Sequence, residues 1–163
     1  MRRLLLNPLS MLLCGLILGA AARLMDIYCE NLGEIFSQLS IWILIGTLIA
    51  VYSPSRKAAA LNILPFCLGM LLTYYAVAIL THGVYGRRFI VGWTAFAFFS
   101  PMLAYFTWQA KEPGKLAVFI RIGIILVSVT ANFLMFGGPR VYDLIINAAL
   151  IYVLFFKNIK RST

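Results

Sequence analysis

The sequence predicts an all-α protein, a polytopic transmembrane helix bundle with six spans and both termini in the cytoplasm. Hydrophobic residues make up 63% of the 163 residues and charged residues only 12%, whereas soluble domains carry about 25% charged residues. Six long apolar stretches fill nearly the whole chain, and a stretch of about 20 apolar residues matches the hydrocarbon core of a bilayer. Only short polar breaks separate these stretches, so no extramembrane domain is expected.

The spans belong to a single transmembrane domain that covers residues 1–163. They are predicted at residues 8–25, 35–52, 58–81, 89–109, 116–136 and 139–156. The breaks at 26–34, 53–57, 82–88, 110–115 and 137–138 carry charge or turn-forming residues. The last span opens with Pro139 after two glycines, and proline suits the first turn of a helix. The basic start and the small residues 19–22 also fit a secretory signal peptide, but the apolar run continues to Met25, which favours an uncleaved helix.

Basic residues set the expected orientation, because the cytoplasmic loops of membrane proteins are enriched in Lys and Arg. This rule puts both termini in the cytoplasm and the protein in the cell inner (plasma) membrane as a multi-pass protein. The net charge of +9 then reflects topology, and no nucleic-acid partner is expected. The larger, inner set is Arg2, Arg3, Arg56, Lys57, Lys111, Lys115, Lys157, Lys160 and Arg161, and the outer set is Arg23, Arg87, Arg88 and Arg140.

The sixth span opens with Arg140, Asp143 and Asn147, which share one helical stripe. One interpretation is an interfacial Arg–Asp pair with Asn147 bonded to a neighbouring helix, and the other is one wall of a ligand site. The fifth span carries Asn132 at a similar depth. Two asparagines on sequential helices can hydrogen-bond across their interface.

Four further residues complete the candidate set. Arg23 and Asp26 lie three residues apart at the end of the first span, and a carboxylate partner lowers the cost of an arginine near the bilayer. Tyr74 in the third span can face the bundle interior or simply pack between helices. Trp93 lies near the start of the fourth span, where it can sit at the membrane interface or form a wall of the pocket. Pro101, in mid-span after Ser100, predicts a kink and a freed carbonyl that can line a cavity.

Gly15 and Gly19 form a small-residue face on the first span. Such spacing lets two helices approach closely, either within the chain or against a membrane protein partner. With six spans and inner termini, this layout resembles the substrate-binding S components of energy-coupling-factor vitamin transporters, and it is similar to other small bacterial six-span proteins of unassigned function. The resemblance implies a ligand site near the outer face and a first helix that contacts a partner, although glycines stand where that family more usually has alanines.

The leading functional hypothesis is the solute-binding component of a small-molecule uptake system. Its pocket in the outer half would be formed by Arg23, Asp26, Tyr74, Asn132, Asp143 and Asn147, with Trp93 as an apolar wall. Transport would need an external motor, because the chain lacks a GxxxxGK[ST] phosphate loop. The alternative is a non-catalytic accessory protein that acts through helix contacts with a partner.

A third hypothesis is an intramembrane enzyme that uses Asp26, Glu30, Glu34 and Asp143 for acid–base chemistry. No nucleophile–base pair accompanies these carboxylates, so the protein is expected not to be an enzyme. No cofactor and no metal are expected either, since His82 is the single histidine and the three cysteines form no CxxC pair.

Overall fold

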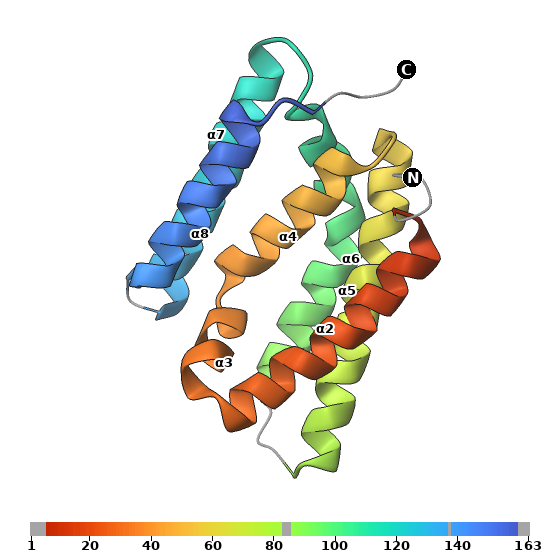
Figure 1. Ribbon diagram of the computed structural model, residues 1–163, viewed down its shortest axis with the longest axis vertical. Helices are drawn as coiled ribbons and strands as arrows, with labels where there is room; N and C mark the ends of the chain where they lie inside the picture. Colours follow the sequence, from red (N-terminus) through yellow and green to blue (C-terminus); the bar gives the residue numbers. More distant parts are fainter. Residues whose placement is uncertain (1–5, 83–85, 137, 160–163) are drawn as a thin grey trace.

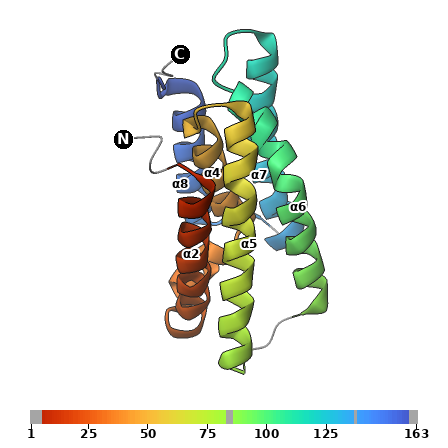
Figure 2. The same cartoon turned by 90° about the vertical axis from the view of Figure 1, so that its right-hand side faces the viewer.

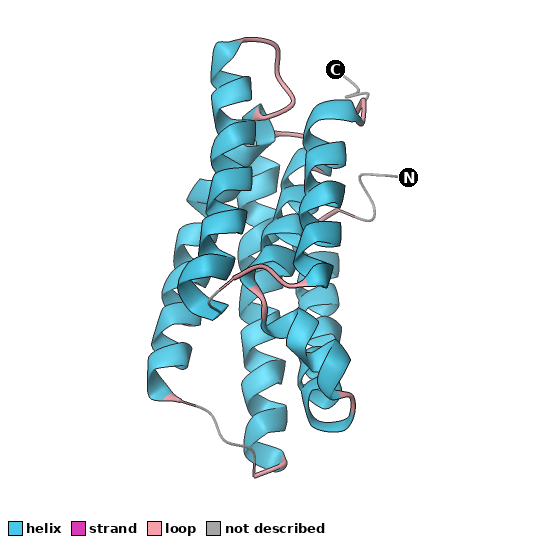
Figure 3. Ribbon diagram, turned by 90° about the vertical axis from the view of Figure 1, so that its left-hand side faces the viewer, coloured by secondary structure: helices cyan, strands magenta, loops and turns pink. Residues whose placement is uncertain are grey.

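The computed structural model describes residues 6–82, 86–136 and 138–159, and these residues confirm the all-α class because they contain helices and no strand (Figure 3). Within this part of the chain, α2, α5, α6 and α7 are long and apolar enough to cross a membrane. The helices are α2 (Pro8–Tyr28), α3 (Glu30–Ser37), α4 (Leu39–Tyr52), α5 (Arg56–Leu80), α6 (Arg87–Gln109), α7 (Lys115–Phe136) and α8 (Val141–Ile151), and α8 continues into a π-helical turn, η1 (Tyr152–Phe156).

The helices lie side by side and run alternately along the long axis of the bundle (Figure 1). α5 lies between α2 and α6 and contacts both (Figure 2). α7 and α8 pack as an antiparallel pair at the other side of the molecule. α4 joins the two groups, because it contacts α5 and α6 on one side and α7 and α8 on the other.

The predicted second span, 35–52, is not one continuous helix. Gln38 adopts an extended conformation with ψ of 140° and separates α3 from α4. The Trp42 Nε1 donates a hydrogen bond of 2.7 Å to the Phe36 carbonyl oxygen across this break, which fixes the angle between the two helices. α4 alone has 14 residues and measures about 21 Å at 1.5 Å per residue.

The stretch 26–34, which was predicted to be a polar loop between two spans, is mostly helical. α2 continues to Tyr28, and only Cys29 separates it from α3. The chain can fold back so sharply because Gly33 lies directly against Asp26, where a Cβ atom would overlap the Asp26 Cα.

The small-residue face of α2 is occupied within the chain. A Cβ atom at Gly15 would overlap the Phe66 carbonyl oxygen, and one at Gly19 would overlap that of Met70. Thr73 of α5 adds an interhelical hydrogen bond of 2.7 Å from its Oγ1 to the Leu16 carbonyl oxygen. Gly15 and Gly19 therefore pack α2 on α5 within the chain, and the contact of this helix with a membrane protein partner stays a prediction.

The sixth helix begins later than expected. Arg140 is the N-cap and α8 starts at Val141, so Pro139 lies outside the helix rather than in its first turn. At the other end the Lys111 Nζ donates to the carbonyl oxygens of Leu154 at 3.0 Å and Lys157 at 2.8 Å. Of the residues used to predict the topology, Arg2, Arg3, Gly137, Lys160 and Arg161 lie outside the described residues, as do the side chains of Glu30 and Arg88.

Candidate functional site

A cavity of about 290 Å³ lies between α4, α5, α6 and α7. Its walls are aromatic and aliphatic, and they include Trp42 on α4, Phe66 on α5 and Trp93 on α6. Only a few lining side chains carry a polar group. The lining residues are Leu39, Trp42, Ile43, Gly46, Thr47, Ile63, Phe66, Cys67, Met70, Leu71, Trp93, Phe96, Ala97, Ser100, Leu103, Ala104, Phe106, Thr107, Ile120, Gly123, Ile124 and Val127.

The cavity wall is most exposed on α6 and α7, which indicates an opening between these two helices. Its most exposed lining residues are Leu103 and Phe106 on α6, at 44% and 49%, and Val127 on α7, at 57%. The outer faces of the same helices are apolar as well, with Phe98 at 67% and Phe119 at 75% exposure. In a bilayer this opening would therefore face acyl chains and not water.

Gly123 provides part of the empty space. A Cβ atom built at Gly123 meets no heavy atom within 4 Å, and at Gly46 it meets only the Ile63 Cδ1, at 3.7 Å. Small residues at these two positions therefore leave the cavity unfilled where α4 and α7 converge on α5 and α6.

Pro101 lies in α6 beside the cavity, and the backbone carbonyl that it leaves without a donor is hydrogen-bonded by a neighbouring side chain. Proline has no N–H and leaves the carbonyl four residues earlier, that of Ala97, without its helical donor. The Ser100 Oγ donates to this oxygen at 2.7 Å. The freed carbonyl expected from the sequence is thus already bonded, and the cavity wall stays nearly apolar at this point.

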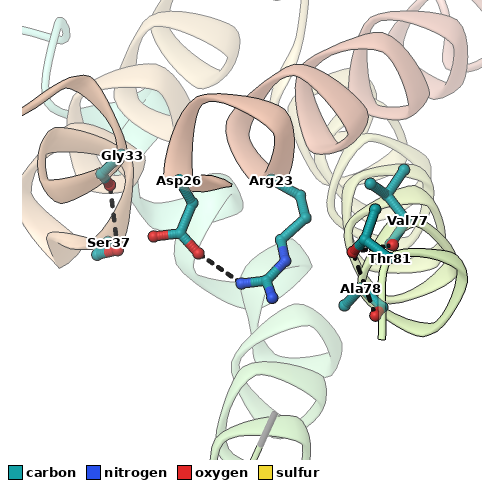
Figure 4. A network of polar contacts seen from close by, with 7 residues as sticks. All are labelled: Arg23, Asp26, Gly33, Ser37, Val77, Ala78 and Thr81. Carbon is teal, nitrogen blue, oxygen red and sulfur yellow. Dashed lines mark hydrogen bonds and ion pairs between the residues drawn. The ribbon is translucent and has the colours of Figure 1, made fainter. Parts of the chain in front are cut away.

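The seven predicted ligand-binding residues are divided among three places. Arg23 and Asp26 on α2 form an ion pair, with 2.5 Å between Nη1 and Oδ2 (Figure 4). The Arg23 guanidinium also lies over the Tyr74 ring of α5, at 5.6 Å from its centroid, in a cation–π contact. These three residues hold α2 to α5 at one end of the bundle, and none of them lines the cavity. Trp93 does line it.

Asp143 and Asn147 lie on α8, which packs on α4 and α7. The Asp143 carboxylate is completely buried and accepts hydrogen bonds from the Ser40 Oγ at 2.7 Å and the Arg140 backbone N–H at 3.0 Å. The Asn147 Nδ2 donates to the Asp143 carbonyl oxygen at 2.8 Å.

The predicted Arg140–Asp143 pairing is therefore made by the backbone only. The Arg140 guanidinium instead contacts Glu34 of α3 at 2.6 Å and the Tyr142 hydroxyl at 2.7 Å. This exposed pair links α3 to the start of α8.

Asn132 on α7 is completely buried, and neither its Oδ1 nor its Nδ2 has a hydrogen-bond partner. The Ser128 Oγ one turn earlier is also buried and unpartnered, and so is the Asn147 Oδ1. The expectation of a direct Asn132–Asn147 hydrogen bond is wrong, because Asn147 bonds its own helix instead.

Of the lining residues, Trp93 and Ser100 were singled out from the sequence, but most of the wall was not. Phe66 and Ile124 are ordinary apolar positions within their spans, and their place beside an internal space depends on how four helices converge. Gly46 and Gly123 are two mid-span glycines with no charged or turn-forming residue nearby, and they were the sequence feature that could have indicated a cavity.

Comparison of the chain with family models, with curated proteins and with solved structures gave no match. Its class therefore follows from its own features: four long apolar helices, exposed apolar side chains on their outer faces, and polar groups drawn inward. These features are those of a membrane-embedded helical protein. Among the described residues there is no group of three or more His, Cys, Asp or Glu side chains that could hold a metal ion.

Proposed function

We propose that this protein is a non-catalytic membrane binding protein that takes an apolar molecule from the bilayer into the cavity between α4, α5, α6 and α7. The observation that supports it is the apolar cavity with a lateral opening between α6 and α7. Its volume of about 290 Å³ is at the lower end of the range for small-molecule sites, about 300–1,000 Å³. A lipid acyl chain or a similar slender hydrocarbon fits this size and polarity.

The proposal changes the expected ligand from a polar solute to an apolar one. A charged ligand in this cavity would lose its hydration and find only weak partners such as Thr47 and Thr107, and burying an unpaired charge is costly. The charged residues expected to bind it are engaged elsewhere, since Arg23 pairs with Asp26 and the Asp143 carboxylate accepts a hydrogen bond from Ser40. Trp93 keeps the role of an apolar wall.

Six crossings with both termini in the cytoplasm, in the cell inner membrane, remain our proposal for the topology. The alternating directions of α2, α4, α5, α6, α7 and α8 support an even number of passes. α4 and α8 are shorter than the other four, and a thinner bilayer or flanking polar residues can accommodate short helices. If the protein takes part in uptake, a separate partner must supply the energy.

The cavity can be tested by filling it. Gly123→Leu would place a side chain into the empty space, and Gly92→Leu is the matched control because Gly92 also has no heavy atom within 4 Å but lies outside the cavity lining. Both are made in a Trp93→Phe/Trp108→Phe background, which leaves Trp42, a lining residue with 8% exposure, as the single tryptophan. The probe is 1-bromododecane, an uncharged hydrocarbon chain whose bromine quenches only a tryptophan it contacts.

Saturable quenching of Trp42 is expected in the background protein and in Gly92→Leu, with at least a tenfold weaker apparent affinity in Gly123→Leu. Native mass spectrometry of gently purified protein should also show a retained lipid or hydrocarbon, lost in Gly123→Leu alone. Equal, non-saturating quenching in all three proteins would contradict the proposal.

A further inference from the structure

A second buried feature lies outside the cavity, where α4, α7 and α8 meet. α7 presents Arg121, Ile125, Ser128 and Asn132 on one helical stripe. This stripe faces α8 and η1, because the Arg121 guanidinium lies 5.5 Å from the centroid of the Phe155 ring and Ile125 packs against the buried cluster that contains Leu150 and Leu154.

The antiparallel register brings the polar residues of the two helices to one level. If both helices rise 1.5 Å per residue, the register set by the Arg121–Phe155 contact of this antiparallel pair places Ser128 near the level of Ala148 and Asn132 near that of Leu144. Asp143 and Asn147 flank these positions on the buried face of α8. Ser40 of α4 joins them through its 2.7 Å hydrogen bond to Asp143. We call Ser40, Ser128, Asn132, Asp143 and Asn147 the polar cluster.

The polar cluster is rich in unused oxygen ligands. The Ser128 Oγ, the Asn132 Oδ1 and the Asn147 Oδ1 are all buried without a hydrogen-bond partner. The orientation of Asn147 is set by its Nδ2, which donates to the Asp143 carbonyl oxygen, so its Oδ1 is left free to bind something else. A buried polar group without a partner costs about 1–3 kcal/mol, and these three oxygens lie within about one turn of one another along the helix pair.

The polar cluster also holds a negative charge without a cationic side chain. Asp143 has 0% exposure and makes no ion pair within the described residues, since the nearby Arg140 guanidinium is committed to Glu34. The N-terminus of α8 offsets about half an elementary charge. The two hydrogen bonds to the carboxylate add no net charge, so the remaining charge calls for a positive partner.

From these observations we infer that the polar cluster is a binding site for a monovalent cation of the Na⁺ type. Hard cations take carboxylate, amide and hydroxyl oxygens as ligands, and these are the groups present. A single carboxylate balances one positive charge, whereas divalent ions generally call for more. The Asn132 Nδ2 cannot bind a cation and is left to donate to a carboxylate or a water.

The site can be tested on the full chain in mild detergent by ²²Na⁺ scintillation-proximity binding, and by Tm in NaCl against choline chloride at equal ionic strength. The wild type should bind ²²Na⁺ saturably, with competition by Li⁺ but not choline, and NaCl should raise its Tm by about 5 °C. Asn132→Leu should reduce Na⁺ affinity at least tenfold. Thr130→Val is the matched control, because Thr130 is an exposed residue of the same helix that bonds only within it, and it should bind like the wild type.

If ²²Na⁺ binding is too weak to measure, the Tm of Asn132→Leu in the two salts still distinguishes a bound cation from an empty site. If no cation is present, replacing an unpartnered buried amide by leucine should raise the Tm equally in both salts. If a cation is bound, the gain should appear only in choline chloride, and the NaCl response should vanish. Asp143→Asn should abolish ²²Na⁺ binding. Equal Tm values of the wild type in both salts, with no ²²Na⁺ binding, would overturn the inference and leave water as the occupant of the polar cluster.

Discussion

The hydroxyl side chains of this protein have different structural roles, which depend on the acceptor that each one bonds. The shortest hydrogen bonds of Thr73, Ser100 and Ser40 are each 2.7 Å long, but they go to a neighbouring helix, to a carbonyl freed by proline and to a buried carboxylate, respectively. The Thr73 hydroxyl also lies 3.1 Å from the Gly69 carbonyl oxygen of its own helix. In lipid, where water does not compete, each of these bonds removes a donor that would otherwise be unsatisfied. The interhelical one, from Thr73 to Leu16, contributes directly to the packing of α2 on α5.

Replacing Thr73 by valine should therefore destabilise the protein modestly. Valine keeps the shape but removes the donor, and interhelical hydrogen bonds in membrane proteins contribute about 0.6 kcal/mol on average and up to about 1.7 kcal/mol. The expected loss corresponds to a fall in Tm of about 2–4 °C in detergent. Thr130→Val should leave the Tm unchanged, since the Thr130 hydroxyl bonds only its own helix. A fall of equal size in both variants would show that the Leu16 contact adds nothing.

For single polar residues, an ion-pair partner within one helix could be predicted from the sequence, but partners on other helices could not. The Arg23–Asp26 pair follows from a spacing of three residues within one helix, so it could be anticipated. The Ser40–Asp143 bond joins residues 103 positions apart, and a sequence pattern carries no information about that distance. The local bond from Asn147 to its own helix was not foreseen either.

Among the helices, α2 and α5 form the closest pair, and their approach depends on glycine. Gly15 and Gly19 on α2 meet the backbone of α5, and on α5 a Cβ atom at Gly69 would come within 2.7 Å of the Leu12 carbonyl oxygen. The main chains thus come into direct contact along this interface. Within a bilayer the hydrophobic effect does not drive helices together, so close packing and its dispersion contacts stabilise the pair instead.

Gly15→Ala should weaken this pair. The new methyl group would overlap the Phe66 carbonyl oxygen, which belongs to the backbone and cannot rotate away, and overpacking of this kind costs about 1–3 kcal/mol. Gly92→Ala on α6 is the matched control, because its Cβ atom meets nothing and alanine favours helix over glycine by about 1 kcal/mol. A thermal melt followed by fluorescence size exclusion should show a lower Tm for Gly15→Ala only. Equal or higher stability of Gly15→Ala would mean that α2 and α5 can separate without cost.

Helix positions were largely predictable from hydropathy, whereas the interruptions were not. The predicted spans coincide with α2, α5, α6 and α7 to within a few residues because each is a long apolar run. The helix break at Gln38 contains no glycine or proline from which it could be predicted. It is stabilised by the hydrogen bond from Trp42 to Phe36, which depends on how the two helices are placed. The acidic stretch 26–34 looked like a loop, but its Asp26 and Glu34 are accommodated in helices through Arg23 and Arg140.

The whole molecule combines two helix groups, α2–α5–α6 and α7–α8, joined by α4. The apolar cavity and the polar cluster both lie along α4, with Trp42 and Ile43 lining the first and Ser40 belonging to the second. Movement of α4 would therefore change both sites together. This arrangement could not be read from the sequence, because the separation of the two groups depends on which helices pair in space.

The alternating helix directions make a sharp prediction for topology. Cys29 at the α2–α3 junction is exposed, whereas Cys67 on α5 is buried. In a background where the other cysteines are replaced by alanine, a membrane-impermeant maleimide should label Cys29 in intact spheroplasts. Lys157→Cys, placed just beyond η1 in a chain without native cysteines, should be labelled only after the membrane is permeabilised. Cys67 alone should stay unlabelled in both conditions and so report on non-specific access. Labelling of Cys29 and of position 157 from the same side of the membrane would rule out the six-crossing arrangement and, with it, the assignment of the inner and outer faces from the basic residues.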